Sequence, residues 1–176
     1  MEVISESSAT AVINASIETI DLTEWMFTLK SHEYQACSSA HIAAGSSISV
    51  DGKRMSINVE QVADNLLIQN YIEEVGEKDH CRVSSISDSF SPAGRTKLGV
   101  IWELKVEKRT DKSCEFINQV KVLMTDEFLS LLKAAGVTDL NPIKAIMEQN
   151  LSAHNQEETP LFAKDIESKA LSGIWV

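Results

Sequence analysis

The chain has 176 residues, and its 26 acidic against 16 basic side chains give a formal net charge of −10. Hydrophobic residues make up 43%, with only seven glycines and three prolines, which excludes a collagen-like or largely disordered chain. The acidic balance argues against nucleic acid and against anionic membrane surfaces as partners, because both need a basic face. This length predicts a single domain with one core over residues 1–176.

The cysteines and the N-terminal segment indicate the cellular compartment in which the protein is expected. Cys37, Cys81 and Cys114 are odd in number and widely spaced, which fits neither a disulfide framework nor a zinc site. We therefore expect buried free thiols in a reducing compartment. Residues 1–10 lack the basic and apolar regions of a signal peptide, and no apolar run approaches the about 18 residues of a spanning helix. These features predict a cytoplasmic protein without stable membrane insertion.

The first part of the chain predicts one strand followed by short helices. Residues 1–7 are expected to form a disordered tail, and the alternation from Ser8 to Ile17 predicts a strand. Between residues 18 and 37 the apolar spacing becomes helical, and Asp21 or Thr19 can cap the start. The residues that carry this spacing are Leu22, Trp25, Met26 and Leu29. One or two short helices are expected there.

From residue 40 to residue 125 the pattern is one strand after another. Asp51-Gly52 is a strong hairpin signal, because both central positions favour positive φ. Met55, Ile57 and Val59 share one face of the strand that follows. The expected strands cover residues 41–50, 54–62, 66–75, 80–90, 96–108 and 113–124. The links between them are too short for parallel crossovers, so they predict an antiparallel meander of about six strands.

The C-terminal part predicts amphipathic helices. Thr125 can cap a first helix that stops at Gly136, and Asn141-Pro142 has the preferred order for starting a second one. Thr159-Pro160 either kinks this second helix or starts another. One continuous apolar stripe runs along it through Ile143, Ile146, Met147 and Leu151. This stripe is the element long enough to cover the apolar face of the meander.

The resulting order is an α+β arrangement of strand, short helices, meander and long terminal helix. It resembles the START-like, or SRPBCC, superfamily, whose helix-grip fold wraps a curved antiparallel sheet of about seven strands around a long C-terminal helix. The resemblance covers residues 8–172 and rests on element order, on the helix carrying Trp25 and on the terminal helix after Met124. It implies a cavity between sheet and terminal helix that takes apolar small molecules. The superfamily includes polyketide cyclases, lipid-transfer domains, plant hormone receptors, birch-pollen allergens and chaperone-activating domains.

Motifs that carry chemistry are weak in this sequence. No phosphate-binding glycine loop, GxSxG or HExxH pattern occurs, and the four histidines are expected to lie apart, at the surface or at loop ends. His154 lies three and four residues before Glu157 and Glu158, which on a helix raises the basicity of an imidazole. A solvated helix end is the favoured interpretation of that group. A cyclase-type site of Arg82, Arg95 and Asp88 is a further possibility, with Arg82 expected to point outward.

Three functions follow from this layout. The favoured one is non-enzymatic binding of an apolar or amphipathic small molecule, or of a lipid, in the cavity. The expected contacts are Asn118 as polar anchor and, as lining, Trp102, Phe116, Met124, Phe128, Leu132 and Met147. The alternatives are a cyclase or dehydratase that needs an inward titratable group, and an interaction module with a filled core and an exposed apolar patch. No catalytic residue, cofactor or metal site is assigned, and the ligand and the oligomeric state stay open.

Overall fold

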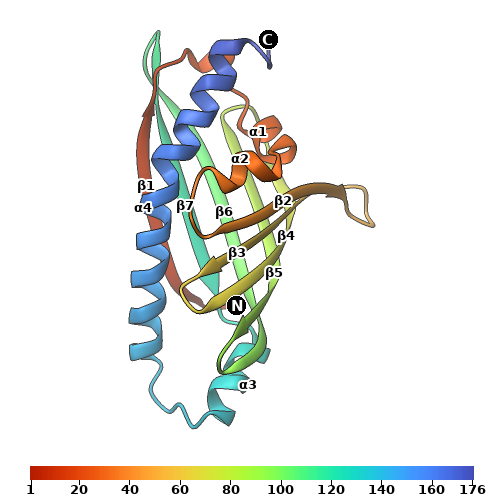
Figure 1. Ribbon diagram of the computed structural model, residues 1–176, viewed down its shortest axis with the longest axis vertical. Helices are drawn as coiled ribbons and strands as arrows, with labels where there is room; N and C mark the ends of the chain where they lie inside the picture. Colours follow the sequence, from red (N-terminus) through yellow and green to blue (C-terminus); the bar gives the residue numbers. More distant parts are fainter.

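The computed structural model describes residues 1–176 and shows one curved antiparallel sheet gripping a long helix (Figure 1). The seven strands follow the order β1-β7-β6-β5-β4-β3-β2. Their bounds are β1 (Val3–Ile13), β2 (His41–Ile48), β3 (Arg54–Val62), β4 (Asn65–Gly76), β5 (His80–Ser91), β6 (Gly94–Thr110) and β7 (Ser113–Leu123). The helices are η1 (Ile17–Thr19), α1 (Leu22–Thr28), α2 (Ser31–Gln35), α3 (Asp126–Ala134) and α4 (Asn141–Ser172). The predicted helix-grip architecture is confirmed.

The meander forms as predicted because turns and alternation agree. Gly52 has a φ of 81° in the β2–β3 turn, a conformation that glycine adopts without strain. On β6 every second side chain is buried, and these residues are Leu98, Val100, Trp102, Leu104 and Val106. They belong to the face that the sequence pattern marks as apolar, so the inner wall of the sheet follows directly from the alternation.

The predicted tail at residues 1–7 is wrong, because most of it lies in β1. Ile4, Ser5 and Ser7 are buried, and β1 pairs with β7 from Val3 to Ile13. Without β1, strand β7 would present a row of unpaired backbone groups at the sheet edge. The strand therefore starts five residues earlier than the pattern suggests and ends at Ile13, before η1.

The C-terminal helix is continuous through Thr159-Pro160. Pro160 has no N–H to donate to the carbonyl of Gln156, which removes one bond from the helix ladder. In the turn before Pro160, the side chain of Thr159 donates to the carbonyl of Asn155 at 2.5 Å. α4 contacts β1, β7 and β3, and so crosses the concave face of the sheet. No helix combines the length and the apolar character needed to cross a membrane.

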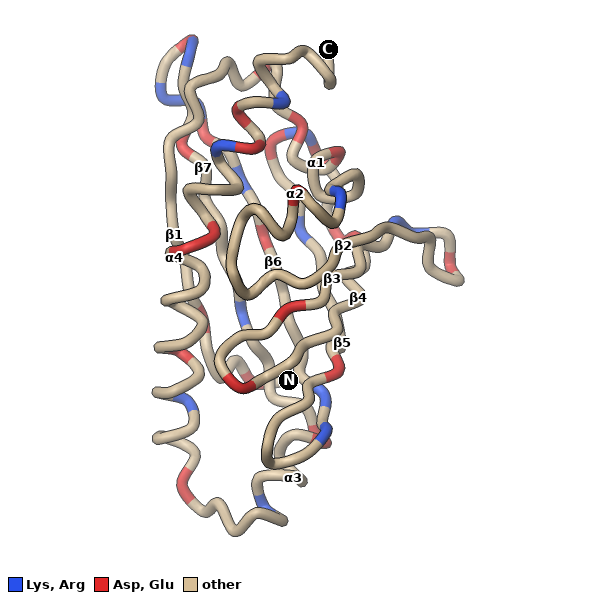
Figure 2. Tube along the Cα trace, in the orientation of Figure 1, with Lys and Arg blue, Asp and Glu red and all other residues tan.

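Charged side chains do not form a basic surface in this fold. Figure 2 shows Lys and Arg interspersed with Asp and Glu along the trace. Many of the cations are paired with carboxylates, as in Arg54 with Glu24 and Glu73, and Lys169 with Glu33 and Asp165.

Candidate functional site

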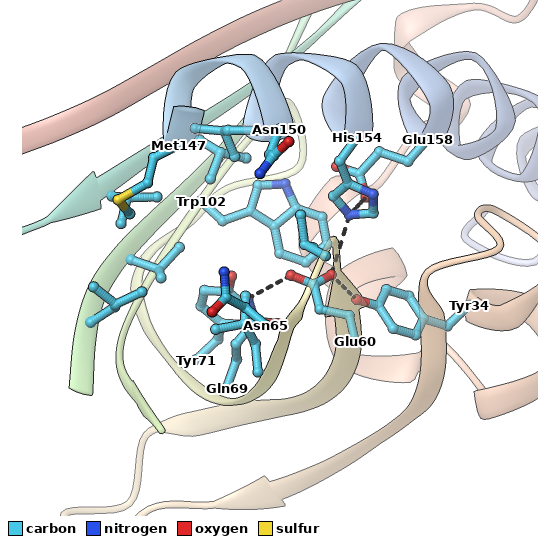
Figure 3. A pocket seen from close by; sticks show the side chains of 17 residues that line it. Tyr34, Glu60, Asn65, Gln69, Tyr71, Trp102, Met147, Asn150, His154 and Glu158 are labelled. Atoms are coloured by element: carbon cyan, nitrogen blue, oxygen red, sulfur yellow. Dashed lines mark hydrogen bonds and ion pairs between the residues drawn. The ribbon is translucent and has the colours of Figure 1, made fainter. Parts of the chain in front are cut away.

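A cavity of about 90 Å³ lies between the sheet and α4 (Figure 3). One part of its wall is apolar and comes from Val62, Leu67, Leu98, Val100, Val120, Val122, Met147 and Leu151. The opposite part is polar and comes from Tyr34, Glu60, Gln69, His154 and Glu158. Tyr71, Trp102, Asn65 and Asn150 complete the lining. This volume has room for several water molecules and is below the about 300–1,000 Å³ typical of sites for drug-sized ligands.

Four buried titratable side chains meet at the polar end, and we call His41, Glu60, His154 and Glu158 the histidine–glutamate cluster. Nε2 of His41 lies 3.0 Å from Oε2 of Glu158 and 3.8 Å from Oε2 of Glu60. Nε2 of His154 lies 3.2 Å and 3.3 Å from the same two oxygens. Each imidazole therefore faces both carboxylates, and the four charge-bearing atoms point to one common centre.

The cluster is assembled from three elements. His41 begins β2, Glu60 is near the end of β3, and His154 and Glu158 lie one turn apart on α4. The edge strand β2 and its neighbour β3 curl over the concave side of the sheet, and this places the start of β2 against the middle of α4 (Figure 1). The curvature thus brings together residues that are over a hundred positions apart in the chain.

The outer atoms of the cluster are held by further hydrogen bonds. Nδ1 of His41 is 2.7 Å from the backbone carbonyl oxygen of Tyr34. The side-chain hydroxyl of Tyr34 donates to Oε2 of Glu60 at 2.9 Å. Amide groups donate to the other carboxylate oxygens, Gln69 to Oε1 of Glu60 at 2.9 Å and Asn118 to Oε1 of Glu158 at 3.0 Å. Nδ1 of His154 is buried and has no hydrogen-bond partner within the protein. The cluster is held rigidly except at this one nitrogen.

The electrostatics of the cluster favour the ionised forms of His154 and Glu158. Burial by itself would lower the pKa of His154, but the hydrogen bonds and charges of Glu158 and Glu60 outweigh it and raise the pKa to about 10. Burial would raise the pKa of Glu158, but its hydrogen bonds to His154 and His41 outweigh it and lower the pKa. Burial, assisted by the nearby carboxylates, raises the pKa of Tyr34 and Tyr71 well above the ordinary value for tyrosine. Both shifts favour an ion pair between a protonated His154 and the carboxylate of Glu158, whose nearest atoms are 3.2 Å apart.

The expectation that the histidines lie apart and that His154 sits at a solvated helix end is wrong. His41 and His154 are 6% and 9% exposed, and their ring centroids are 5.2 Å apart. The i, i+4 spacing of His154 and Glu158 was visible in the sequence, but their buried partners on β2 and β3 were not. One signal was available on β3, where Ser56, Asn58 and Glu60 form the buried face and the apolar residues Met55, Ile57 and Val59 are only half-buried.

Two of the seven expected ligand contacts line the cavity, namely Trp102 and Met147. Phe116 is fully buried in the main core, and Met124, Phe128 and Leu132 lie at β7's end and on α3, outside the lining. Asn118 is buried behind the wall, where its Oδ1 accepts from Trp102 at 2.7 Å and its Nδ2 donates to Glu158 and Thr159. Its position is that of a residue that holds Trp102 and Glu158 in place. Contact with a ligand stays a prediction for all seven residues.

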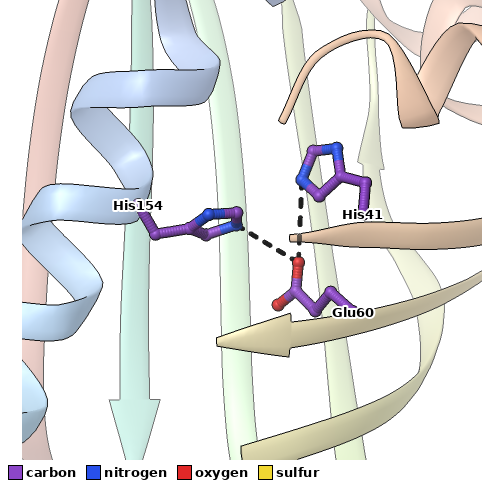
Figure 4. A group of neighbouring side chains, drawn as sticks. All are labelled: His41, Glu60 and His154. Carbon is purple, nitrogen blue, oxygen red and sulfur yellow. Dashed lines mark hydrogen bonds and ion pairs between the residues drawn. The ribbon is translucent and has the colours of Figure 1, made fainter. Parts of the chain in front are cut away.

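The alternative group of Arg82, Arg95 and Asp88 does not border the cavity. Arg95 pairs with Asp88 at 2.9 Å on the exposed end of β5 and β6. Arg82 points outward, as expected, and pairs with Glu74 at 2.9 Å. These residues therefore form surface ion pairs, while the titratable groups at the cavity belong to the histidine–glutamate cluster. That cluster also supplies the residues that could hold a metal ion, since ligand atoms of His41, Glu60 and His154 lie within 4.8 Å of one another (Figure 4).

No protein-family model and no curated protein sequence matches the chain. Solved structures do match in fold. The di-domain ARO/CYC StfQ from the steffimycin biosynthetic pathway has a TM-score of 0.61 at 9% identity, over 96% of this chain and 52% of StfQ. Major latex-like protein 151 from Panax ginseng has a TM-score of 0.51 at 12% identity, over 94% and 97% of the two chains. A conserved protein from Geobacillus kaustophilus has a TM-score of 0.52 at 7% identity, over 95% of each chain.

Identities this low show the fold alone. The chain has the helix-grip fold, with the antiparallel meander and the terminal helix that the sequence predicted, and it shares this fold with StfQ and the latex-like protein. The match to StfQ spans one half of that di-domain protein, which is consistent with one such unit in the present chain. What the site does must be argued from its own residues.

Proposed function

We propose that the protein binds a small amphipathic molecule in the cavity between the sheet and α4. The observation that carries this proposal is the division of one cavity into an apolar wall and a charged end. An apolar portion of the ligand lies against β6, β7 and the first turns of α4, where burial contributes about 25 cal/mol per Å². A polar group lies at the charged end, near Glu60 and His154.

The charged end defines what that polar group can be. The carboxylates of Glu60 and Glu158 accept hydrogen bonds, and Nδ1 of His154 lacks a protein partner. A ligand with a hydroxyl group at its tip can donate a hydrogen bond to one of these carboxylates, and this favours binding in one orientation. The ligand is expected to be short, because the cavity holds only about 90 Å³. Met147, with its flexible side chain, is the lining residue best suited to enlarge it.

A second candidate function is proton-transfer chemistry on the bound molecule. Glu60, His154 and Glu158 line the cavity, so groups that give and take protons border the ligand space, which meets the requirement set by the cyclase or dehydratase hypothesis. Among the proteins of similar fold, StfQ is described as ARO/CYC, and that description supports this candidate by analogy of fold only.

The binding proposal is tested with a matched pair of tryptophan substitutions. Val122 is half-buried and lines the cavity, so Val122→Trp fills the space, whereas Ile86→Trp adds the same ring at a 48% exposed position on β5. Native mass spectrometry of the purified protein and thermal shifts with short-chain fatty acids, alcohols and phenols provide the readout. We expect binding by the wild type and by Ile86→Trp, and loss of binding in Val122→Trp. If the wild type binds none of these compounds, the interaction module becomes the better explanation.

The catalytic candidate has a separate test. Compounds that bind and carry a carbonyl group are incubated with the protein in D₂O, and deuterium uptake beside the carbonyl is followed by NMR. We expect uptake above the buffer rate, and its loss in Glu60→Gln with binding retained. Binding without uptake would leave ligand binding as the function and exclude this chemistry for the compounds tested.

A further inference from the structure

We propose that the histidine–glutamate cluster is a binding site for one divalent first-row transition metal ion, with Zn²⁺ as its simplest probe. The ligand atoms would be Nε2 of His41 and His154 and Oε2 of Glu60 and Glu158. This inference goes beyond the binding of an organic molecule and does not depend on it, because ligand atoms of His41, Glu60 and His154 lie together whether or not the neighbouring cavity is filled (Figure 4).

The spacing of the four atoms fits coordination of a single ion. Metal–ligand bonds of about 2.0–2.2 Å place neighbouring ligand atoms roughly 3–3.5 Å apart. The four nitrogen–oxygen separations in the cluster are 3.0, 3.2, 3.3 and 3.8 Å. His41, Glu60 and His154 form the group whose ligand atoms all lie within 4.8 Å of one another, so they are the first three ligands of the proposed ion. Glu158, at 3.0 and 3.2 Å from the two imidazoles, is the fourth and would have to move toward Glu60 as the ion enters.

The surroundings of the cluster are those of a metal site. Metal-bound imidazoles commonly donate their second N–H to a carbonyl or carboxylate, and ligating carboxylates are themselves hydrogen-bonded. His41 meets the first condition through the carbonyl of Tyr34. Glu60 and Glu158 meet the second through the amides of Gln69 and Asn118, which donate to Oε1 of each carboxylate. The hydroxyl of Tyr34 also donates to Oε2 of Glu60, so this oxygen would keep that hydrogen bond through its second lone pair or exchange it for the ion. Three of the four side chains are thus oriented by hydrogen bonds from outside the cluster.

Charge and ligand type narrow the choice of ion. Two buried carboxylates carry two negative charges, and a divalent ion balances them when both imidazoles are neutral. On binding, the ion takes the Nε2 lone pair of each imidazole, and a hydrogen carried there leaves to solvent. Two imidazoles with two carboxylates suit zinc and its first-row neighbours, whereas magnesium and calcium prefer sites made of oxygen alone.

The test uses the whole protein freed of metal with a chelator, without any organic ligand. Zn²⁺ and Mg²⁺ are titrated calorimetrically, and Co²⁺ is titrated while the visible absorption spectrum is recorded. We expect one equivalent of Zn²⁺ per chain at micromolar concentration or below, visible absorption bands with Co²⁺, a higher melting temperature with Zn²⁺, and no binding of Mg²⁺. Absence of saturable Zn²⁺ and Co²⁺ binding by the wild type would overturn the proposal, whatever the variants do.

Variants locate the site. His154→Ala and Glu60→Gln should each weaken Zn²⁺ binding, and Gln69→Leu, which removes an orienting amide, should weaken it by about 10–100-fold. His80→Ala is the matched control, because His80 also lies 2.7 Å from a carboxylate, that of Glu103, but in a partly exposed pair on the other side of the sheet. Its affinity should equal that of the wild type. Circular dichroism verifies that each variant folds. The assignment is contradicted if His80→Ala weakens Zn²⁺ binding as much as the other variants do. It is also contradicted if both Glu60→Gln and His154→Ala retain tight binding.

Discussion

The two halves of α4 differ in how they meet the sheet, although they form one uninterrupted helix. Residues 141–153 include no buried side chain, and Ile146 of the predicted apolar stripe is 56% exposed. Residues 154–172 contain all eight buried positions of the helix. We call these the open half and the packed half. The open half borders the cavity through Met147, Asn150 and Leu151, and the packed half closes the main core.

The comparison teaches that hydrophobic periodicity and burial are separate properties. The clearest apolar stripe lies on the open half, where Met147 and Leu151 face a cavity and Ile146 is largely exposed to solvent. The packed half buries four polar residues, which are His154, Asn155, Glu158 and Thr159. These residues are tolerated because nearly every polar atom finds a partner, as Asn155 does with Ser7 and with the carbonyl of Asn118.

The largest expected difference between the halves comes from removing one large side chain in each. Phe162 is fully buried and lies 5.0 Å, ring to ring, from Trp25, so Phe162→Ala should lower the free energy of unfolding by about 3–5 kcal/mol. Leu151 is half-buried at the cavity, so Leu151→Ala should cost less than about 2 kcal/mol. Urea unfolding followed by tryptophan fluorescence measures both. Equal costs would mean that the open half is packed in solution.

The next effect concerns a buried carboxylate on the packed half. Glu158→Ala leaves the imidazoles of His41 and His154 without one of their two partners, and should destabilise the metal-free protein by about 3 kcal/mol. Glu148→Ala on the open half removes an exposed carboxylate and should change stability by less than about 0.5 kcal/mol. The same unfolding experiment applies, and a neutral Glu158→Ala would show that the buried ion pairs contribute nothing net.

A smaller effect of opposite sign is expected within the packed half at Pro160. This side chain is exposed, so Pro160→Ala loses little packing, and the new N–H can donate to the carbonyl of Gln156. The free energy of unfolding should rise by about 1 kcal/mol. A decrease would indicate that the missing bond helps the helix to curve over the sheet, and the helical signal in circular dichroism would fall in parallel.

The smallest expected effect is that the cysteines of the main core, which the packed half closes, do not react with a thiol reagent. Burial raises the pKa of both Cys37 and Cys81 to about 12, so at pH 8 only about one molecule in ten thousand carries the reactive thiolate at either site. Native protein should leave a thiol reagent unconsumed until urea is added. Ile146→Cys, on the open half, should react at once and serves as the control; rapid reaction of the wild type would show that the core opens readily.

The sequence was sufficient for the fold and insufficient for the site. Strands and turns follow from local alternation and from Asp51-Gly52, and the terminal helix follows from its periodic stripe, all within short windows of the chain. The site depends on tertiary curvature that brings His41 and Glu60 to α4, and no spacing in the sequence encodes that approach. On β3 the polar residues face inward, because His154, Tyr34 and Gln69 supply hydrogen bonds to the carboxylate of Glu60. The apolar alternation on this strand therefore marks the outer face and not the inner one.

The pairing of β1 with β7 also has a consequence for the order of folding. Residues 3–13 find their sheet partner in residues 113–123, so this pairing closes a loop of about a hundred residues. The consecutive hairpins from β2 to β7 can form locally, whereas β1 must wait for the last strand of the sheet to be synthesised. During translation the first strand therefore stays unpaired, because most of the chain must emerge from the ribosome before β7 is available to pair with it.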